Sequence, residues 1–166
     1  MDEDILFQSE DLDLSVKIGA GALSEIVKLA VGAGSNETGS VLIGSYIDDR
    51  SVLITRGSFI PKGSIGCRCR YKRGTQGLQE YYQKVFRNSG GKEYYVGEWH
   101  FHPGGDAAPS AIDDSTMASI SHDMNDRGMV SVIVGGSIAT KPEIGVSVYI
   151  GERRIDLRCQ NTTSID

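Results

Sequence analysis

Residues 97–113 have the sequence GEWHFHPGGDAAPSAID, which carries the strongest structural signal in the chain. His100 and His102 are two residues apart, and Asp113 follows the second histidine by eleven residues. The aromatic, alternating pattern of residues 94–102 predicts a β-strand. Side chains two residues apart in a strand share a face, so we expect both imidazoles on one side of a sheet.

The residues after this strand predict a loop and then a helix. Pro103 cannot donate a hydrogen bond to a strand ladder, so it ends the strand, and residues 104–109 form the loop. Ser110 is a typical N-cap for a helix that runs to about Arg127. Asp113 then lies in the first helical turn, where a tight loop would bring its carboxylate over the two histidines.

Two imidazoles and one carboxylate make a set of three protein ligands for zinc. Three ligands leave a fourth position for water, which distinguishes a catalytic zinc site from a structural one. Two other interpretations compete: the histidines can be a partly exposed pair without a metal, and Ser-x-x-Asp can be a capping box alone. Spacing alone also leaves Asp106 and Asp114 as rivals to Asp113.

The pattern His-x-His-Pro, a short loop and Ser-x-x-Asp resembles the signature of the JAMM (JAB1/MPN/Mov34) metalloprotease family. Members of that family are zinc isopeptidases that remove ubiquitin or ubiquitin-like proteins, and related members process sulfur-carrier proteins. The resemblance covers roughly residues 10–158. It implies an α/β (α+β) fold of the MPN/JAB type, with a mixed β-sheet flanked by helices in a cytidine-deaminase-like layering.

The resemblance also implies a role for each motif residue. His100, His102 and Asp113 match the zinc ligands, which implies one Zn2+ per chain. Glu37, within the segment NETGSVLIG, matches the general acid/base. Ser110 matches the residue that helps to stabilise the oxyanion, so every motif position is filled.

Other ionisable residues compete for these roles. Without the family pattern, Glu37 is an ordinary solvated residue between a helix and a strand. Glu98 shares the strand face of the two histidines, so it is a rival base or a partner that orients an imidazole. His122 lies about three turns into the predicted helix, which indicates a surface residue rather than a ligand.

The wider motif is similar to that of stand-alone bacterial JAMM proteins from mobile elements and anti-phage operons. In such operons the peptidase accompanies ubiquitin-activating-like and ubiquitin-conjugating-like proteins, which implies these as partners. One setting is CBASS defence, where the conjugated protein is a nucleotidyltransferase. The implied substrate is a ubiquitin-like modifier or its conjugate.

Length and composition favour one domain over residues 1–166, with a core at about 10–158 and a frayed polar C-terminus at 159–166. The acidic start lacks the basic region of a signal peptide, and no apolar run could span a membrane. Three unevenly placed cysteines do not make a disulfide framework. We therefore expect a cytoplasmic protein that has no membrane as partner, and the net charge of −5 argues against nucleic acid as the main partner.

Hydrophobic periodicity predicts the remaining elements. Helices are expected at 21–33 and 76–88. Further strands are expected at 13–18, 40–46, 51–60, 129–134, 145–149 and 153–157, and the pair 40–46 and 51–60 forms a hairpin.

The segment from 61 to 77 is basic and has no acidic residue. In one interpretation its basic residues bind an acidic surface of the protein substrate. The candidates are Arg68, Arg70, Lys72 and Arg73. The competing interpretation is a solvated strand edge, where basic residues prevent sheet-to-sheet pairing. Cys67 and Cys69 in the same segment are expected to be reduced thiols rather than half of a second metal site.

The expected function is that of a zinc-dependent isopeptidase or endopeptidase, which cleaves after the C-terminus of a ubiquitin-like modifier. Two alternatives stay open at this point. One is a hydrolase that processes the tail of a sulfur-carrier protein. The other is a non-catalytic MPN scaffold.

Overall fold

The computed structural model describes residues 3–10, 13–125, 127–137 and 141–160. None of the helices in these ranges is both long and apolar enough to cross a membrane. The elements, in chain order, are β1 (Ile5–Gln8), β2 (Ser15–Ile18), α1 (Ala20–Ala33), β3 (Thr38–Asp48), β4 (Ser51–Gly57), β5 (Ile65–Cys67), β6 (Arg70–Lys72), α2 (Leu78–Asn88), β7 (Tyr94–Phe101), α3 (Ala111–Asp123), β8 (Met129–Ser137), β9 (Lys141–Ile150) and β10 (Arg153–Cys159).

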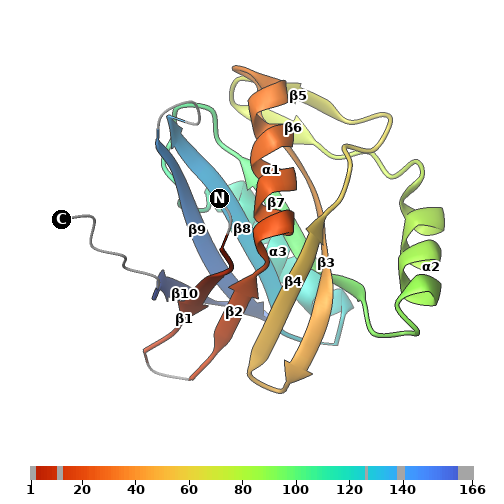
Figure 1. Ribbon diagram of the computed structural model, residues 1–166. Coiled ribbons are helices and arrows are strands. Elements are labelled where there is room, and N and C mark those ends of the chain that lie inside the picture. Colours follow the sequence, from red (N-terminus) through yellow and green to blue (C-terminus); the bar gives the residue numbers. More distant parts are fainter. Residues whose placement is uncertain (1–2, 11–12, 126, 138–140, 161–166) are drawn as a thin grey trace.

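A curled mixed sheet forms the centre of the molecule (Figure 1). Its strands follow the order β1-β10-β9-β8-β7-β3-β4-β2, and the last strand pairs with the first, so the sheet closes. The pairs β2–β4 and β7–β8 are parallel, and the other pairs are antiparallel. Strands β5 and β6 form a separate two-stranded hairpin.

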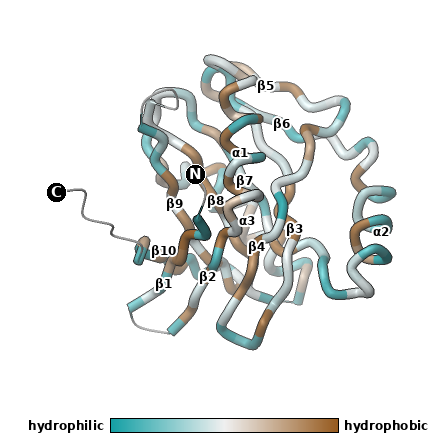
Figure 2. The backbone as a smooth tube through the Cα atoms, in the orientation of Figure 1, coloured by the Kyte–Doolittle hydropathy of each residue, from teal (hydrophilic) through white to brown (hydrophobic). Residues whose placement is uncertain are grey.

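Helices cover both faces of this sheet, as the family fold implies. Leu42 of β3 faces the large inner cluster that contains Leu23 and Ile26 of α1. Its neighbours on β3, Val41 and Ile43, face the other way and pack against α2. Strand residues alternate between faces, so a strand covered on both sides is apolar throughout. In Figure 2 the strands are largely brown or pale, whereas hydrophilic teal marks much of the β3–β4 turn.

The outer face also carries α3, through a third apolar cluster. Met117 of α3 packs there against Met129 and Tyr149, which lie on β8 and β9. The expected fold class, a mixed sheet with helices on its faces, is therefore confirmed.

Most predicted elements are present, with shifted bounds. The helix after Ser110 ends at Asp123 rather than near Arg127, because Asn125 adopts a left-handed conformation with φ of 57°. Gly34 is the C-cap of α1. Strand β10 extends to Cys159, which pairs with Phe7, and 161–166 of the expected frayed C-terminus lie outside the described residues.

Two features were not predicted. One is β1, a four-residue strand next to an acidic terminus. The other is the pairing of β5 with β6 as a hairpin of three-residue strands, where the sequence offered only a strand edge as one interpretation of 61–77. Such short strands give too little alternation to stand out.

A β-bulge in β7 sets which side chains reach the outer face. Leu42 pairs with Gly97 and Ile43 pairs with Tyr95, so one residue of β7 is inserted there. A Cβ on Gly97 would lie 1.8 Å from the carbonyl oxygen of Val130, so only glycine fits. Beyond the bulge, the even-numbered residues from 98 onward lie on the outer face.

Candidate metal centre

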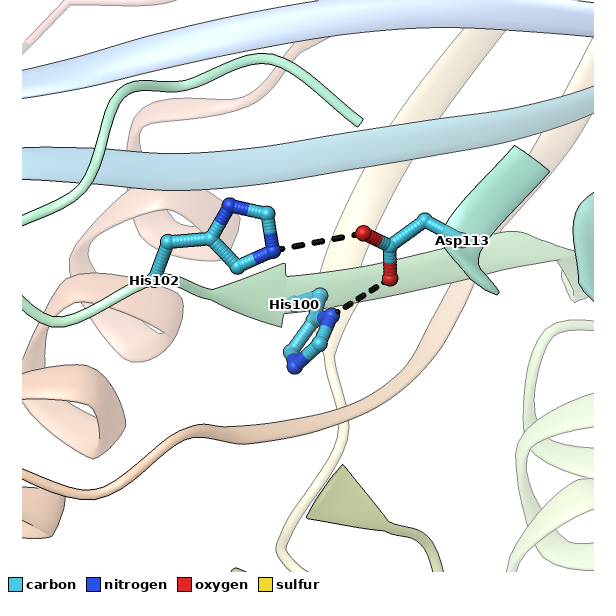
Figure 3. A group of neighbouring side chains, drawn as sticks. All are labelled: His100, His102 and Asp113. Atoms are coloured by element: carbon cyan, nitrogen blue, oxygen red, sulfur yellow. Dashed lines mark hydrogen bonds and ion pairs between the residues drawn. The ribbon is translucent and has the colours of Figure 1, made fainter. Parts of the chain in front are cut away.

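His100 and His102 project from the end of β7 toward the first turn of α3 (Figure 3). The Nδ1 atom of His100 lies 2.8 Å from Oδ1 of Asp113, and Nε2 of His102 lies 3.3 Å from Oδ2 of the same carboxylate. Three ligand atoms, one from each residue, lie within 4.8 Å of one another. The alternation predicted for the strand therefore brings both imidazoles to one face.

Asp113 is held in place by the end of its own helix. Ser110 is the N-cap of α3, and its hydroxyl and backbone N–H donate to Oδ2 of Asp113 at 2.5 and 2.7 Å. The backbone N–H of Asp113 donates to the Ser110 hydroxyl at 3.2 Å, which completes a capping box. The capping-box and metal-site interpretations are thus compatible, because one carboxylate serves both.

Electrostatics keep this carboxylate ionised. Burial by itself raises the pKa of Asp113, but hydrogen bonds from His100, His102 and Ser110 outweigh it and hold that pKa far below its usual range. An ionised carboxylate is the form that binds a metal cation.

His102 is oriented by contacts on both sides of its ring. Its hydrogen bond to Asp113 raises the pKa of the imidazole, while desolvation lowers it, and a bond to the backbone of Asp106 raises it further. Metal-binding histidines commonly use one nitrogen as ligand and donate from the other to a carbonyl or carboxylate. Asp106 therefore contributes its backbone, and its carboxylate instead accepts a bond from the N–H of Ala108 at 3.3 Å.

Glu37 reaches the same site from the residue before β3. Its Oε2 lies 3.4 Å from Nε2 of His100, and its side chain is mostly buried. No hydrogen bond satisfies that buried nitrogen among the described residues. An orphaned imidazole nitrogen, a second imidazole and an ionised carboxylate are a donor set that suits Zn2+, so these residues fit a zinc ion.

The residues that compete for these roles lie apart from the group or are held by other partners. Asp114 accepts hydrogen bonds from the Tyr149 hydroxyl at 2.7 Å and from Arg154 at 2.9 Å. Glu98 does share the face of the histidines, but it pairs with Arg73 at 2.7 Å. His122 is exposed in the last turn of α3. Within the described ranges, none of them joins the group of potential ligands.

A pocket of about 340 Å³ opens beside the candidate metal centre. Its lining includes both proposed catalytic residues, Glu37 and Ser110, and also Arg70 and Arg73 of the basic segment. Arg68 lines a neighbouring groove beside the loop that follows β7. Lys72 is exposed at the end of β6. The basic segment therefore borders the site, although its cations do not converge on one point.

Sequence reasoning missed Tyr71, whose ring centroid lies 5.7 Å from that of His100. Tyr71 belongs to no motif, and the hairpin that carries it was not predicted. The bidentate pairing of Glu98 with Arg73 was also missed, although the position of Glu98 two residues before His100 marked it as a neighbour of the site.

The family model of prokaryotic homologs of the JAB domain matches residues 19–150 of this chain. The chain belongs to the prokaryotic JAB family. A curated relative of this JAB domain, from Enterobacter hormaechei subsp. hoffmannii (strain UCI 50), is named a CD-NTase/cGAS isopeptidase. It is 35% identical over 149 residues, which cover 88% of this chain and 81% of the relative.

A solved structure supports the fold of this JAB domain. The solution structure of protein DSY2949 from Desulfitobacterium hafniense is similar, with a TM-score of 0.59. The match covers 84% of this chain and 87% of that protein, at 19% sequence identity. At that identity the likeness concerns the fold alone.

Proposed function

We propose that this JAB domain is a zinc-dependent isopeptidase or endopeptidase. It cleaves the bond after the C-terminus of a ubiquitin-like modifier or a similarly conjugated protein. The observation that carries the proposal is the His100–His102–Asp113 group with the Glu37 carboxylate beside it. The relative named a CD-NTase/cGAS isopeptidase supports a hydrolase acting on a conjugated protein, and with it a role in an anti-phage system.

His100, His102 and Asp113 would hold the zinc ion. Bound zinc supplies Lewis acidity at the scissile carbonyl and makes water acidic enough to ionise near neutral pH. Glu37 takes a proton from the attacking water as the water oxygen bonds to the carbonyl carbon. Glu37 then delivers that proton to the amine nitrogen as the carbon–nitrogen bond breaks, so the proton balance closes within the site.

Ser110 would stabilise the oxyanion that develops on the carbonyl oxygen. Its hydroxyl has one proton, which here goes to Oδ2 of Asp113. The oxyanion role therefore requires the hydroxyl to rotate toward the pocket that Ser110 lines. The backbone N–H of Ser110 keeps its own bond to Asp113 and can hold the carboxylate during that rotation.

The substrate's C-terminal tail would approach along the β5–β6 hairpin. An extended tail can add to an exposed strand edge through main-chain hydrogen bonds, and such pairing reads backbone more than side chains. Arg68, Arg70, Lys72 and Arg73 would attract an acidic surface of the modifier. Arg73 has less freedom than the others because it already pairs with Glu98.

The test is a zinc measurement and a cleavage assay on the purified protein. Substrates are fusions of candidate modifiers, including a CD-NTase C-terminus and a sulfur-carrier tail, to a reporter protein. We expect stoichiometric zinc, cleavage after the modifier's last residue, and loss of cleavage in Glu37→Gln and His102→Ala. Full activity in His102→Ala would rule out the metal mechanism. Cleavage of the sulfur-carrier fusion alone would favour a sulfur-carrier protein as the substrate.

A further inference from the structure

The β5–β6 hairpin packs directly against the backbone that carries Glu37. The N–H of Glu37 donates to the carbonyl of Cys67, at the end of β5, at 2.8 Å. Gly66 lies so close that a Cβ there would be 2.1 Å from the carbonyl oxygen of Glu37. Cys67 thus bonds to the peptide group before the Glu37 Cα, and Gly66 packs against the peptide group after it.

Tyr71 extends this contact to the metal centre. Its hydroxyl donates to the carbonyl of Gly39 at 2.5 Å, and its ring lies tilted against the His100 ring. Gly39 is the residue of β3 that pairs with His100 of β7. Tyr71 therefore joins the hairpin to the point where the Glu37 strand and the histidine strand meet.

A second anchor lies beyond Tyr71, at Arg73. The Nε and Nη2 atoms of Arg73 donate to the two carboxylate oxygens of Glu98 at 3.2 and 2.7 Å. The Tyr95 hydroxyl donates to the same carboxylate at 3.2 Å. Charge-assisted bidentate pairs are strong and geometrically specific, so this pair fixes the base of the hairpin on β7. Tyr71 fixes the part that covers the catalytic carboxylate.

The Glu37 carboxylate needs such support. It lies one residue outside β3, where the ladder hydrogen bonds of the sheet begin. A general base must lie within hydrogen-bond reach of the proton that it takes, and a misplacement of about 1 Å can cost on the order of 100-fold in rate. The position of Glu37 then depends on the hairpin packed against its backbone.

We propose that Tyr71 is a positioning residue that holds the β5–β6 hairpin against residues 37–39 and so fixes the Glu37 carboxylate beside His100. The catalytic part of this inference rests on the proposed function. The structural part, docking of the hairpin by the Tyr71 hydroxyl, does not. The main role of residues 61–77 is thus to position the catalytic base, and attraction of an acidic substrate surface is a secondary role.

The experiment compares Tyr71→Phe with Tyr46→Phe. The Tyr46 hydroxyl makes the same kind of bond, to the carbonyl of Gly128 at 2.5 Å, but at the opposite end of β3. In the zinc-free protein, we measure amide hydrogen exchange at Glu37 by NMR. We expect exchange roughly fivefold faster in Tyr71→Phe, because one hydrogen bond that keeps the hairpin closed is lost, and no change at Glu37 in Tyr46→Phe.

The second readout is the kinetics of the zinc-loaded enzyme on a cleavable fusion. Tyr71→Phe should lower kcat by roughly fivefold or more, with KM and zinc content unchanged, because the base is misplaced while substrate and metal bind as before. Gly66→Ala keeps the Tyr71 hydroxyl but would place a Cβ 2.1 Å from the Glu37 carbonyl oxygen and 3.4 Å from the Tyr71 ring. It should also speed exchange at Glu37 and lower kcat, and it should raise KM because the substrate tail is proposed to dock along this hairpin. This exposed glycine is also a second route if Tyr71→Phe folds poorly.

Glu37 exchange in Tyr71→Phe that equals the wild-type rate would overturn the proposal. So would a raised KM with unchanged kcat, which would make Tyr71 a substrate contact instead. If the wild-type enzyme cleaves no fusion, the proposed function fails. The exchange measurement still decides whether Tyr71 holds the hairpin on Glu37, so the two failures are distinguishable.

Discussion

The hydroxyl of Tyr149 donates a 2.7 Å hydrogen bond to Asp114, and this bond ties the first turn of α3 to β9. Arg154 of β10 contacts both oxygens of the same carboxylate, at 2.9 and 3.0 Å. The hydrogen bond from Tyr149, with smaller contributions from Arg154, holds the pKa of Asp114 below its usual range. Asp114 thus anchors the turn from which the neighbouring Asp113 faces the histidines.

This anchor predicts that Tyr149→Phe destabilises the protein more than Arg154→Ala. Tyr149 is 1% exposed, and its bond to the partly exposed Asp114 is half-buried, so removing its hydroxyl should lower the free energy of unfolding by about 0.5–1.5 kcal/mol. The Arg154 side chain is 35% exposed, and surface ion pairs contribute about 0–1 kcal/mol. Urea unfolding of both variants measures the difference, and the opposite order would refute the assignment of the anchor to Tyr149.

Adjacent aspartates give a matched pair for the metal centre. Asp113→Asn removes the charge that faces both histidines. We expect zinc affinity to fall by more than about 100-fold, since removing even a residue that only hydrogen-bonds to a metal ligand lowers metal affinity by about 10- to 100-fold. Asp114→Asn makes the same chemical change one residue away and keeps an oxygen for Tyr149, so zinc should stay bound. Zinc content after dialysis against a weak chelator measures both. Equal retention in the two variants would show that Asp113 is not a ligand.

Much of the candidate metal centre could be predicted because His100, His102 and Asp113 are close in sequence. Alternation in β7 places His100 and His102 on one face, and the capping preference of Ser110 starts α3 where Asp113 can turn back. These are local rules, and they hold here. Glu37 is distant in sequence, and only the family resemblance pointed to it.

The rest depends on long-range contacts that no local pattern encodes. Gly97, at the bulge, lies against Val130 of β8, and Val130 is far from it along the chain. The hairpin strands of residues 65–72 are short and mostly exposed, so their docking on Glu37 follows from tertiary packing. The pairing of Arg73 also depends on tertiary packing and could not be predicted. From the sequence Arg73 is one of several basic residues, and in the fold it is the partner of Glu98.

Ser110 has two proposed roles, and two substitutions separate them. Alanine and glycine both remove the hydroxyl, so each should lower kcat by about 100- to 1000-fold if the hydroxyl stabilises the oxyanion. Alanine is a poor N-cap and should cost about 1 kcal/mol of stability, whereas glycine should cost only a few tenths. Steady-state kinetics and thermal unfolding on the same samples give both numbers. If kcat instead falls only in proportion to the loss of stability, with the alanine variant worse than the glycine variant, Ser110 acts only as the N-cap of α3.

Two glycine-to-alanine substitutions, one at the bulge in β7 and one in α1, should have opposite effects on stability. In Gly97→Ala the new Cβ would lie 1.8 Å from the carbonyl oxygen of Val130, so β7 and β8 must separate. We expect a loss of about 1–3 kcal/mol, typical of overpacking, and weaker zinc binding because the two histidines lie only three and five residues further along the chain. In Gly32→Ala, near the end of α1, the new Cβ has no neighbour within 4 Å among the described residues. That substitution should stabilise the protein by about 0.5–1 kcal/mol, because alanine loses less backbone entropy in a helix. Denaturant unfolding measures both values, and a neutral Gly97→Ala would mean that the close approach of the two strands does not constrain the site.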